Sequence, residues 1–124
     1  MSKLKTEQVL NPNSVVETLT FNTNGSATLA GSVSSTERTI TTGAFDLSTG
    51  NFWTCGAIAI PNPTNQVAGT SGLIRVTAAP TSFASNFKFP SGSYTAPSTF
   101  PAIVPFYVQA SGTILMGKWT EGIA

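Results

Sequence analysis

The segment Thr18–Leu29 reads TLTFNTNGSATL and shows the pattern on which the predicted fold depends. Polar and apolar residues alternate on both sides of Asn24-Gly25, a pair that favours a tight hairpin because both residues tolerate positive φ. A two-residue loop would place Phe21 opposite Thr28, whereas a three-residue loop would place it opposite Ala27 and gather the apolar residues on one face. We therefore predict the three-residue loop, with Gly25 in the left-handed conformation.

The same pattern of short segments continues to the end of the chain. Turns rich in Gly, Pro, Asn and Ser separate the segments, and none of them has helical periodicity. This pattern predicts an all-β fold, either a two-layer β-sandwich or a jelly-roll-like barrel. The further strands expected are 38–42, 44–47, 52–60, 73–77, 83–89, 103–108 and 113–119. Pro105 falls inside one of them, and since proline has no N–H we expect that strand to lie at an edge or to carry a bulge.

The first residues of the chain differ from the rest. Residues 1–16 are polar with isolated apolar positions, and Asn11-Pro12-Asn13 would break any helix there. We predict an extended N-terminal arm at 1–16 and a β-sandwich domain at 17–124. An extended arm can grip a partner through its backbone and through apolar anchors. The candidate partner-binding residues of the arm are Leu4, Val9 and Leu10.

The chain has few of the side chains that catalysis and metal binding require. It has no histidine, one cysteine (Cys55), five carboxylates and only 9% charged residues. A catalytic cysteine needs a base, and none lies near Cys55 in the sequence, so we predict a buried and inert thiol. The carboxylates show no recognisable pairing for hydrolysis, and we expect Glu37-Arg38 to be a solvated ion pair. The composition therefore predicts a protein that is not an enzyme and that uses no metal or cofactor.

Aromatic residues are the remaining candidates for a binding surface. In Phe52-Trp53 and Phe106-Tyr107, adjacent side chains must face opposite sides of a strand, so one of each pair faces the core. We predict that Trp53 and Tyr107 are the outward members and contact a partner. Two uses of such a surface stay open: packing against another subunit, which the small residues nearby favour, and stacking against a glycan.

A second line of inference comes from the order of elements along the chain. The elements are Phe45–Phe52, Pro61-Asn62-Pro63, Leu73–Val76, Phe87–Gly92, Pro97, Ile103–Val108 and Ile114–Gly117. Together with the opening Lys3–Leu10, this order resembles a β-rich module of virion structural proteins from marine, cyanophage-like tailed phages. Such modules are often described as tail fibres or appendages. The resemblance implies a structural protein without catalytic residues.

Among virion locations, the resemblance leads us to expect a capsid decoration or cement protein that binds and stabilises the assembled shell. One arm and one β domain suit a piece that docks on a preformed surface, and they lack the long shaft of a fibre. The alternatives are a tail-fibre or appendage protein and a carbohydrate-binding adhesion module.

The same interpretation predicts the partners. They are the major capsid protein or other virion proteins, further copies of the chain in a homo-oligomer such as a trimer, and, in the adhesion alternative, a glycan. The net charge of +1 includes no basic patch for nucleic acid, and no apolar run is long enough to span a membrane. Met1–Glu7 lacks the apolar stretch of a signal peptide, so we expect assembly in the host cytoplasm and a final location in the virion.

Overall fold

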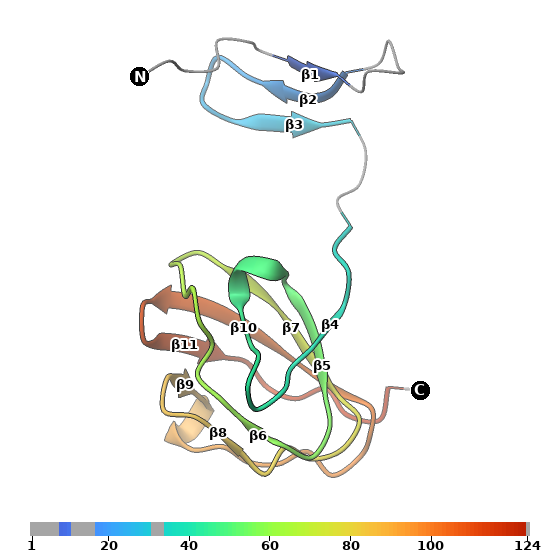
Figure 1. The fold of residues 1–124 in the computed structure, drawn as a ribbon, viewed down its shortest axis with the longest axis vertical. Coiled ribbons are helices and arrows are strands. Elements are labelled where there is room, and N and C mark those ends of the chain that lie inside the picture. The colour runs from blue at the N-terminus through green and yellow to red at the C-terminus, as the bar shows by residue number, and fades with distance from the viewer. Residues whose placement is uncertain (1–7, 11–16, 31–33, 124) are drawn as a thin grey trace. The chain divides into compact units, whose positions relative to one another are not determined.

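The computed structural model describes residues 8–10, 17–30 and 34–123. The chain divides into two compact units, Met1–Ser34 and Ser35–Ala124 (Figure 1). This division falls after Ser34, whereas the boundary predicted from the sequence falls after residue 16. The reason is that residues 17–21 pair with Gln8–Leu10 on one side and with residues 27–29 on the other, in a sheet of their own and not with the sheets of the second unit.

The described residues form an all-β protein, as predicted. Their helical segments are two three-residue 3₁₀ helices, η1 (Leu47–Thr49) and η2 (Pro90–Gly92). Within this part of the chain, no helix has the length and apolar character needed to cross a membrane.

The N-terminal unit is a three-stranded antiparallel sheet. Its strands are β1 (Gln8–Leu10), β2 (Glu17–Phe21) and β3 (Ala27–Leu29). The predicted three-residue hairpin loop is confirmed, because Phe21 pairs with Ala27 and Leu19 with Leu29. Gly25 has φ +86°, a conformation that side chains with a Cβ rarely adopt. The local sequence therefore sets both the turn and the register of this hairpin.

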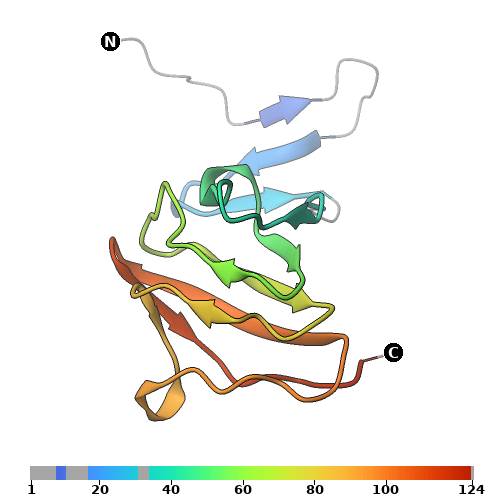
Figure 2. The ribbon, with the colours of Figure 1, turned by 60° about the horizontal axis from the view of Figure 1, so that its bottom comes forward.

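The C-terminal unit is built on a six-stranded mixed sheet. In spatial order its strands are β4 (Arg38–Thr39), β5 (Phe52–Cys55), β7 (Ser71–Val76), β10 (Ala102–Ala110), β11 (Thr113–Met116) and β9 (Phe87–Lys88). Three of the five strand pairs are parallel, and β10 is antiparallel to both of its neighbours. Strand β10 is the longest, and Figure 2 shows it running across the unit. A second sheet consists of two parallel strands, β6 (Ala59–Ile60) and β8 (Ser82–Phe83).

The hydrophobic core lies on one face of the six-stranded sheet, the inner face. Ten alternating residues of the main strands are buried there: Trp53, Cys55, Ile74, Val76, Ala102, Val104, Phe106, Val108, Ile114 and Met116. Ile60 of β6, the loop residue Phe45 and Leu47 of η1 belong to the same cluster, and Phe83 of β8 packs against it. The small sheet and these loops thus form a second layer, which gives the unit its sandwich-like character.

Several predicted strands are interrupted in the structure. The segment 52–60 divides into β5 and β6 at a tight turn in which Ile58 N donates to Gly56 O at 2.9 Å. The segment 83–89 likewise divides into β8 and β9. Among the described residues, the segment 44–47 makes only isolated bridges, one of them parallel between Asp46 and Thr64, before Asp46 caps the helix η1. Alternation alone predicts neither the turns that divide the first two segments nor the isolated bridges of the third.

Pro105 lies in the middle of the sheet, so the predicted edge position is wrong. Strand β10 pairs with β7 on one side and with β11 on the other. On the β11 side, Gly117 N donates to Pro105 O at 2.9 Å, so the pair needs no N–H from the proline. A Cβ on Gly117 would lie 2.6 Å from Pro105 Cγ, so the glycine makes room for the ring. The irregularity that β10 does carry lies elsewhere, between Val108 and Ala110.

Candidate functional site

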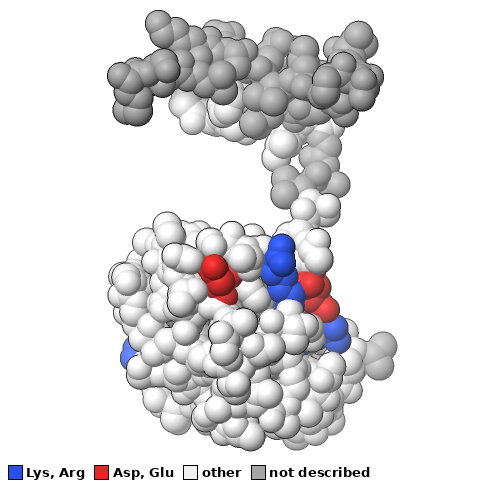
Figure 3. Space-filling view, in the orientation of Figure 1, with Lys and Arg blue, Asp and Glu red and all other residues white. Residues whose placement is uncertain are grey.

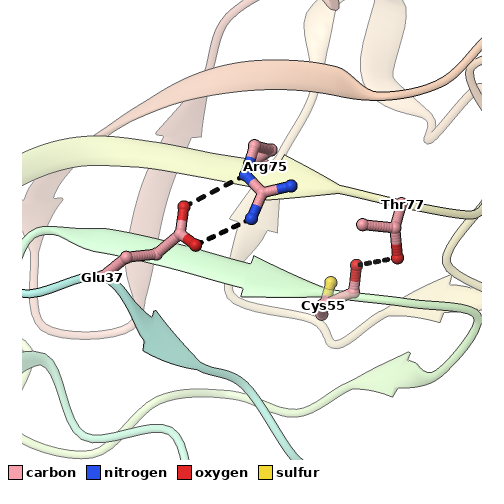
Figure 4. A network of polar contacts seen from close by, with 4 residues as sticks. All are labelled: Glu37, Cys55, Arg75 and Thr77. Carbon is pink, nitrogen blue, oxygen red and sulfur yellow. Dashed lines mark hydrogen bonds and ion pairs between the residues drawn. The ribbon is translucent and has the colours of Figure 1, made fainter.

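Charged side chains are sparse on the C-terminal unit, and most of its surface in Figure 3 is uncharged. Glu37 accepts two hydrogen bonds from Arg75, at 2.7 Å from Nη2 and 3.1 Å from Nε (Figure 4). The Arg75 guanidinium holds the pKa of Glu37 below its ordinary value, chiefly through these hydrogen bonds. The predicted Glu37-Arg38 pair is wrong, since Arg38 Nε donates to the Thr49 carbonyl at 2.6 Å. Side chains of adjacent residues in extended backbone point to opposite sides, so Glu37 pairs with Arg75 of another strand and not with its neighbour Arg38.

Asp46 serves a structural purpose at the start of η1. Its carboxylate accepts hydrogen bonds from Ser48 N, Ser48 Oγ and Asn65 Nδ2 at 2.7–2.9 Å, and these contacts, led by Asn65, lower its pKa. Asp46 and Glu37 both line a hollow of about 340 Å³. Because both carboxylates are held in the ionised form, neither is suited to donate a proton near neutral pH. Among the described residues, no group of three or more His, Cys, Asp or Glu could hold a metal ion.

Cys55 is a core residue of β5. Figure 4 shows its place on the strand. The side chain is buried on the inner face, and burial raises the pKa of its thiol to about 11. A thiol with a raised pKa is a poor nucleophile because little thiolate is present. The prediction that Cys55 is buried is confirmed.

The most distinctive surface of the unit is the face of the six-stranded sheet opposite the core. Phe52 is 41% exposed, Tyr107 is 46% exposed and Leu115 is 42% exposed. We call the outer strip the five apolar or aromatic side chains that strand pairing brings together on this face: Phe52, Leu73, Pro105, Tyr107 and Leu115.

Strand register explains why these residues of four different strands lie together. Leu73 of β7 pairs with Phe52 of β5 on one side and with Pro105 of β10 on the other. Tyr107 lies two residues after Pro105 on β10 and therefore on the same face, and it pairs with Leu115 of β11. The outer strip therefore crosses the sheet in two neighbouring rows.

Charged residues border the outer strip. Arg75 follows Leu73 by two positions on β7, so the Glu37–Arg75 ion pair lies on the same face. Lys88 of β9 pairs with Leu115 at the other side of the sheet. An apolar centre with a charged border is the usual composition of a protein–protein contact surface.

Of the two aromatic residues predicted from the sequence to face a partner, one is exposed and the other is buried. Tyr107 is exposed on the outer strip, as predicted, and its neighbour Phe106 is in the core. Trp53 is only 3% exposed and packs edge-on against Phe45 at 4.8 Å between ring centroids, so its predicted outward position is wrong. Phe52 takes the outward place instead. The sequence contains the signal for this choice, because Trp53 and Cys55 are two residues apart and must share a face.

The predicted partner-binding residues of the arm are only partly within the described structure. Leu4 lies outside the described residues. Val9 and Leu10 belong to β1, where Val9 pairs with Leu19 and Leu10 with Glu17 of β2. The backbone at these two positions is thus used for a sheet within the chain.

Comparison with known proteins returned nothing similar: no protein-family model, no curated protein and no solved structure matches the chain.

Proposed function

We propose that this protein is a structural component of a phage virion, a decoration protein that docks on the assembled capsid shell and packs against further copies of itself. The observation that carries the docking role is the outer strip, an apolar surface on a rigid sheet with no covering layer among the described residues of its unit. The virion assignment rests on the resemblance in the order of turns and strands along the chain.

The chemistry of the polar groups supports a binding role over catalysis. Glu37 and Asp46 are each engaged by hydrogen-bond donors that favour the ionised carboxylate. The thiol of Cys55 is buried. What the surface offers to another molecule is apolar area, which is the main source of affinity between proteins.

The proposed mechanism is mechanical. A protein that binds the assembled shell and not its free subunits shifts the equilibrium towards the shell by mass action. The outer strip would supply the apolar contact, and the Glu37–Arg75 pair and Lys88 at its border would orient the partner. The N-terminal unit, with Leu4, Val9 and Leu10, would reach a neighbouring capsid subunit or a second copy of the chain.

The test is co-sedimentation of the purified protein with capsid shells of the phage that encodes it. We expect saturable binding by the natural protein and loss of binding in Tyr107→Ser and Leu115→Ser. The matched control is Gln109→Ser, an exposed polar position on the same strand as Tyr107. Full binding by both strip variants would contradict the proposed surface. Absence of the natural protein from shells and its presence in the tail fraction would favour the tail-fibre alternative.

A second variant separates the two candidate attachment surfaces. Deleting residues 2–13 removes Leu4, Val9 and Leu10 and leaves the outer strip intact. We expect the deletion to leave a folded C-terminal unit that binds shells more weakly. Full occupancy by the deletion variant would remove the N-terminal segment from the proposal and leave the outer strip as the attachment surface.

A further inference from the structure

We propose that two adjoining hollows around Phe89 form a binding site for a short acidic oligosaccharide. This site contains none of the five residues of the outer strip, although Lys88 at the border of the strip also lines the second hollow. The inference does not depend on the virion assignment.

The two hollows have a common wall. The first has a volume of about 160 Å³ and the second about 280 Å³, and both are lined by Phe89 and Ser93. An apolar cavity of about 150 Å³ can hold one benzene molecule, so each hollow has room for a six-membered ring. Because they share two lining residues, the hollows can take consecutive rings of one chain.

The walls are aromatic and held in place by their neighbours. The ring of Phe83 lies 4.8 Å from that of Phe89 and 4.9 Å from that of Tyr94, both at steep angles. The hydroxyl of Tyr94 donates to the carbonyl of Pro80 at 2.8 Å, which fixes the ring. A preformed aromatic wall loses little conformational entropy when a ligand packs against it.

Trp119 lines the first hollow. It presents the carbon atoms of its ring, and not the ring nitrogen, to a bound ligand. Its indole nitrogen is shielded from solvent and has no acceptor among the described residues, while the side chain lines the hollow. The part of the ring that a ligand can reach is therefore apolar. The C–H faces of a sugar ring match such surfaces, as aromatic side chains present large apolar area with a negative face.

The polar groups around the hollows indicate both hydroxyl and acidic groups on the ligand. Ser93 and Thr95 line the first hollow and can donate or accept hydrogen bonds with sugar hydroxyls. Each hollow is lined by one lysine, Lys118 in the first and Lys88 in the second.

The charges at the site have one sign. No carboxylate is among the described residues that line either hollow. Lys88 Nζ donates one hydrogen bond to the Ser85 carbonyl at 2.6 Å, which leaves two N–H groups for a ligand. A positive group at each of two consecutive ring sites favours a chain of sugar acids over a neutral chain.

The experiment is calorimetric titration of the full chain with hexagalacturonate, an acidic probe, and with maltohexaose, a neutral one. We expect hexagalacturonate to bind, with an affinity that falls as salt is added, and maltohexaose to bind at least about tenfold more weakly. The fluorescence of Trp119 gives a second readout, since the other tryptophan, Trp53, is buried in the core.

Two variants locate the site. Ser93→Phe places a ring in the shared wall of the two hollows and should abolish binding, with circular dichroism confirming the fold. Lys118→Ala should weaken hexagalacturonate at least about fivefold and leave maltohexaose unchanged. The matched control is Arg38→Ala, which removes one positive charge away from the hollows and should bind as the natural protein does. Equal affinity for the two probes, no binding of either, or an unaffected Ser93→Phe would overturn the proposal.

Discussion

The two faces of the six-stranded sheet share one backbone and one set of hydrogen bonds, yet they differ completely in exposure. The apolar side chains of the inner face in β5, β7, β10 and β11 are buried, whereas the outer face carries Phe52, Tyr107 and Leu115 at more than 40% exposure. Because the backbone ladder serves both faces equally, the difference lies in what covers the side chains. The inner face determines stability, and we infer that the outer face determines association.

The largest expected difference between the faces is at the adjacent residues Trp53 and Phe52. Trp53→Ala should lower the free energy of unfolding by about 3–5 kcal/mol, because it leaves a large cavity in the core. Phe52→Ala should lower it by about 1 kcal/mol, since much of that ring is already in water. Urea denaturation of both variants measures the comparison. Equal costs at the two positions would mean that the outer face is covered within the folded chain.

A second test of the inner face uses Cys55. Cys55→Ser should cost about 1–3 kcal/mol because it places a hydroxyl group among apolar neighbours. In the natural protein, a disulfide reagent at pH 8 should label the native thiol far more slowly than the thiol of the urea-unfolded chain. The raised pKa favours folding below the ordinary thiol pKa, and that contribution is lost as the pH rises towards about 11. Rapid labelling of the native state would contradict the burial of Cys55.

On the outer face, Tyr107→Ser should weaken association while leaving stability nearly unchanged. We expect the free energy of unfolding to change by less than about 1 kcal/mol, because the side chain is half exposed. Self-association, measured by analytical ultracentrifugation, should weaken markedly. Gln109→Ser again serves as the control and should change neither quantity. A large loss of stability with unchanged association would reverse the roles assigned to the two faces.

The smallest effect is expected at the ion pair that borders the outer strip. Glu37→Gln should cost less than about 1 kcal/mol at pH 7, because both partners are exposed and screened by solvent. The pKa of Glu37 is lowered in the folded state, so its contribution is present above the ordinary carboxylate pKa and is lost as the pH falls through the folded value. Urea midpoints at pH 7 and pH 3 should therefore differ more for the natural protein than for Glu37→Gln. An identical pH dependence would show that the pair adds nothing to stability.

Predictions that depended on neighbouring residues alone are confirmed at the hairpin and wrong at the Glu37-Arg38 pair. The hairpin at Asn24-Gly25 has the expected loop and the expected register, because turn chemistry fixes which residues face each other. Alternation likewise showed that one member of each aromatic pair is buried. It did not reveal the breaks at Gly56 and after Phe83, since these depend on which strand each segment joins.

The candidate site was predicted in part. Tyr107 was identified from the sequence, and its partners on the outer strip were not, because Phe52, Leu73 and Leu115 come from three other strands. The error at Trp53 arose because periodicity gives two faces without saying which is inside. Cys55, two residues later, was predicted to be buried. Because Trp53 shares a face with Cys55, that prediction already implied that Trp53 faces the core.

The sequence by itself determined the all-β class, the N-terminal hairpin and the scarcity of reactive groups, because these follow from composition and from residues close together in the chain. Only the tertiary structure decided that Glu37 pairs with Arg75, that Pro105 can lie in a central strand opposite Gly117, and which apolar side chains of the C-terminal unit are exposed. Those outcomes depend on the order of strands in the sheet. That order is set by contacts between segments distant in sequence, which local patterns do not record.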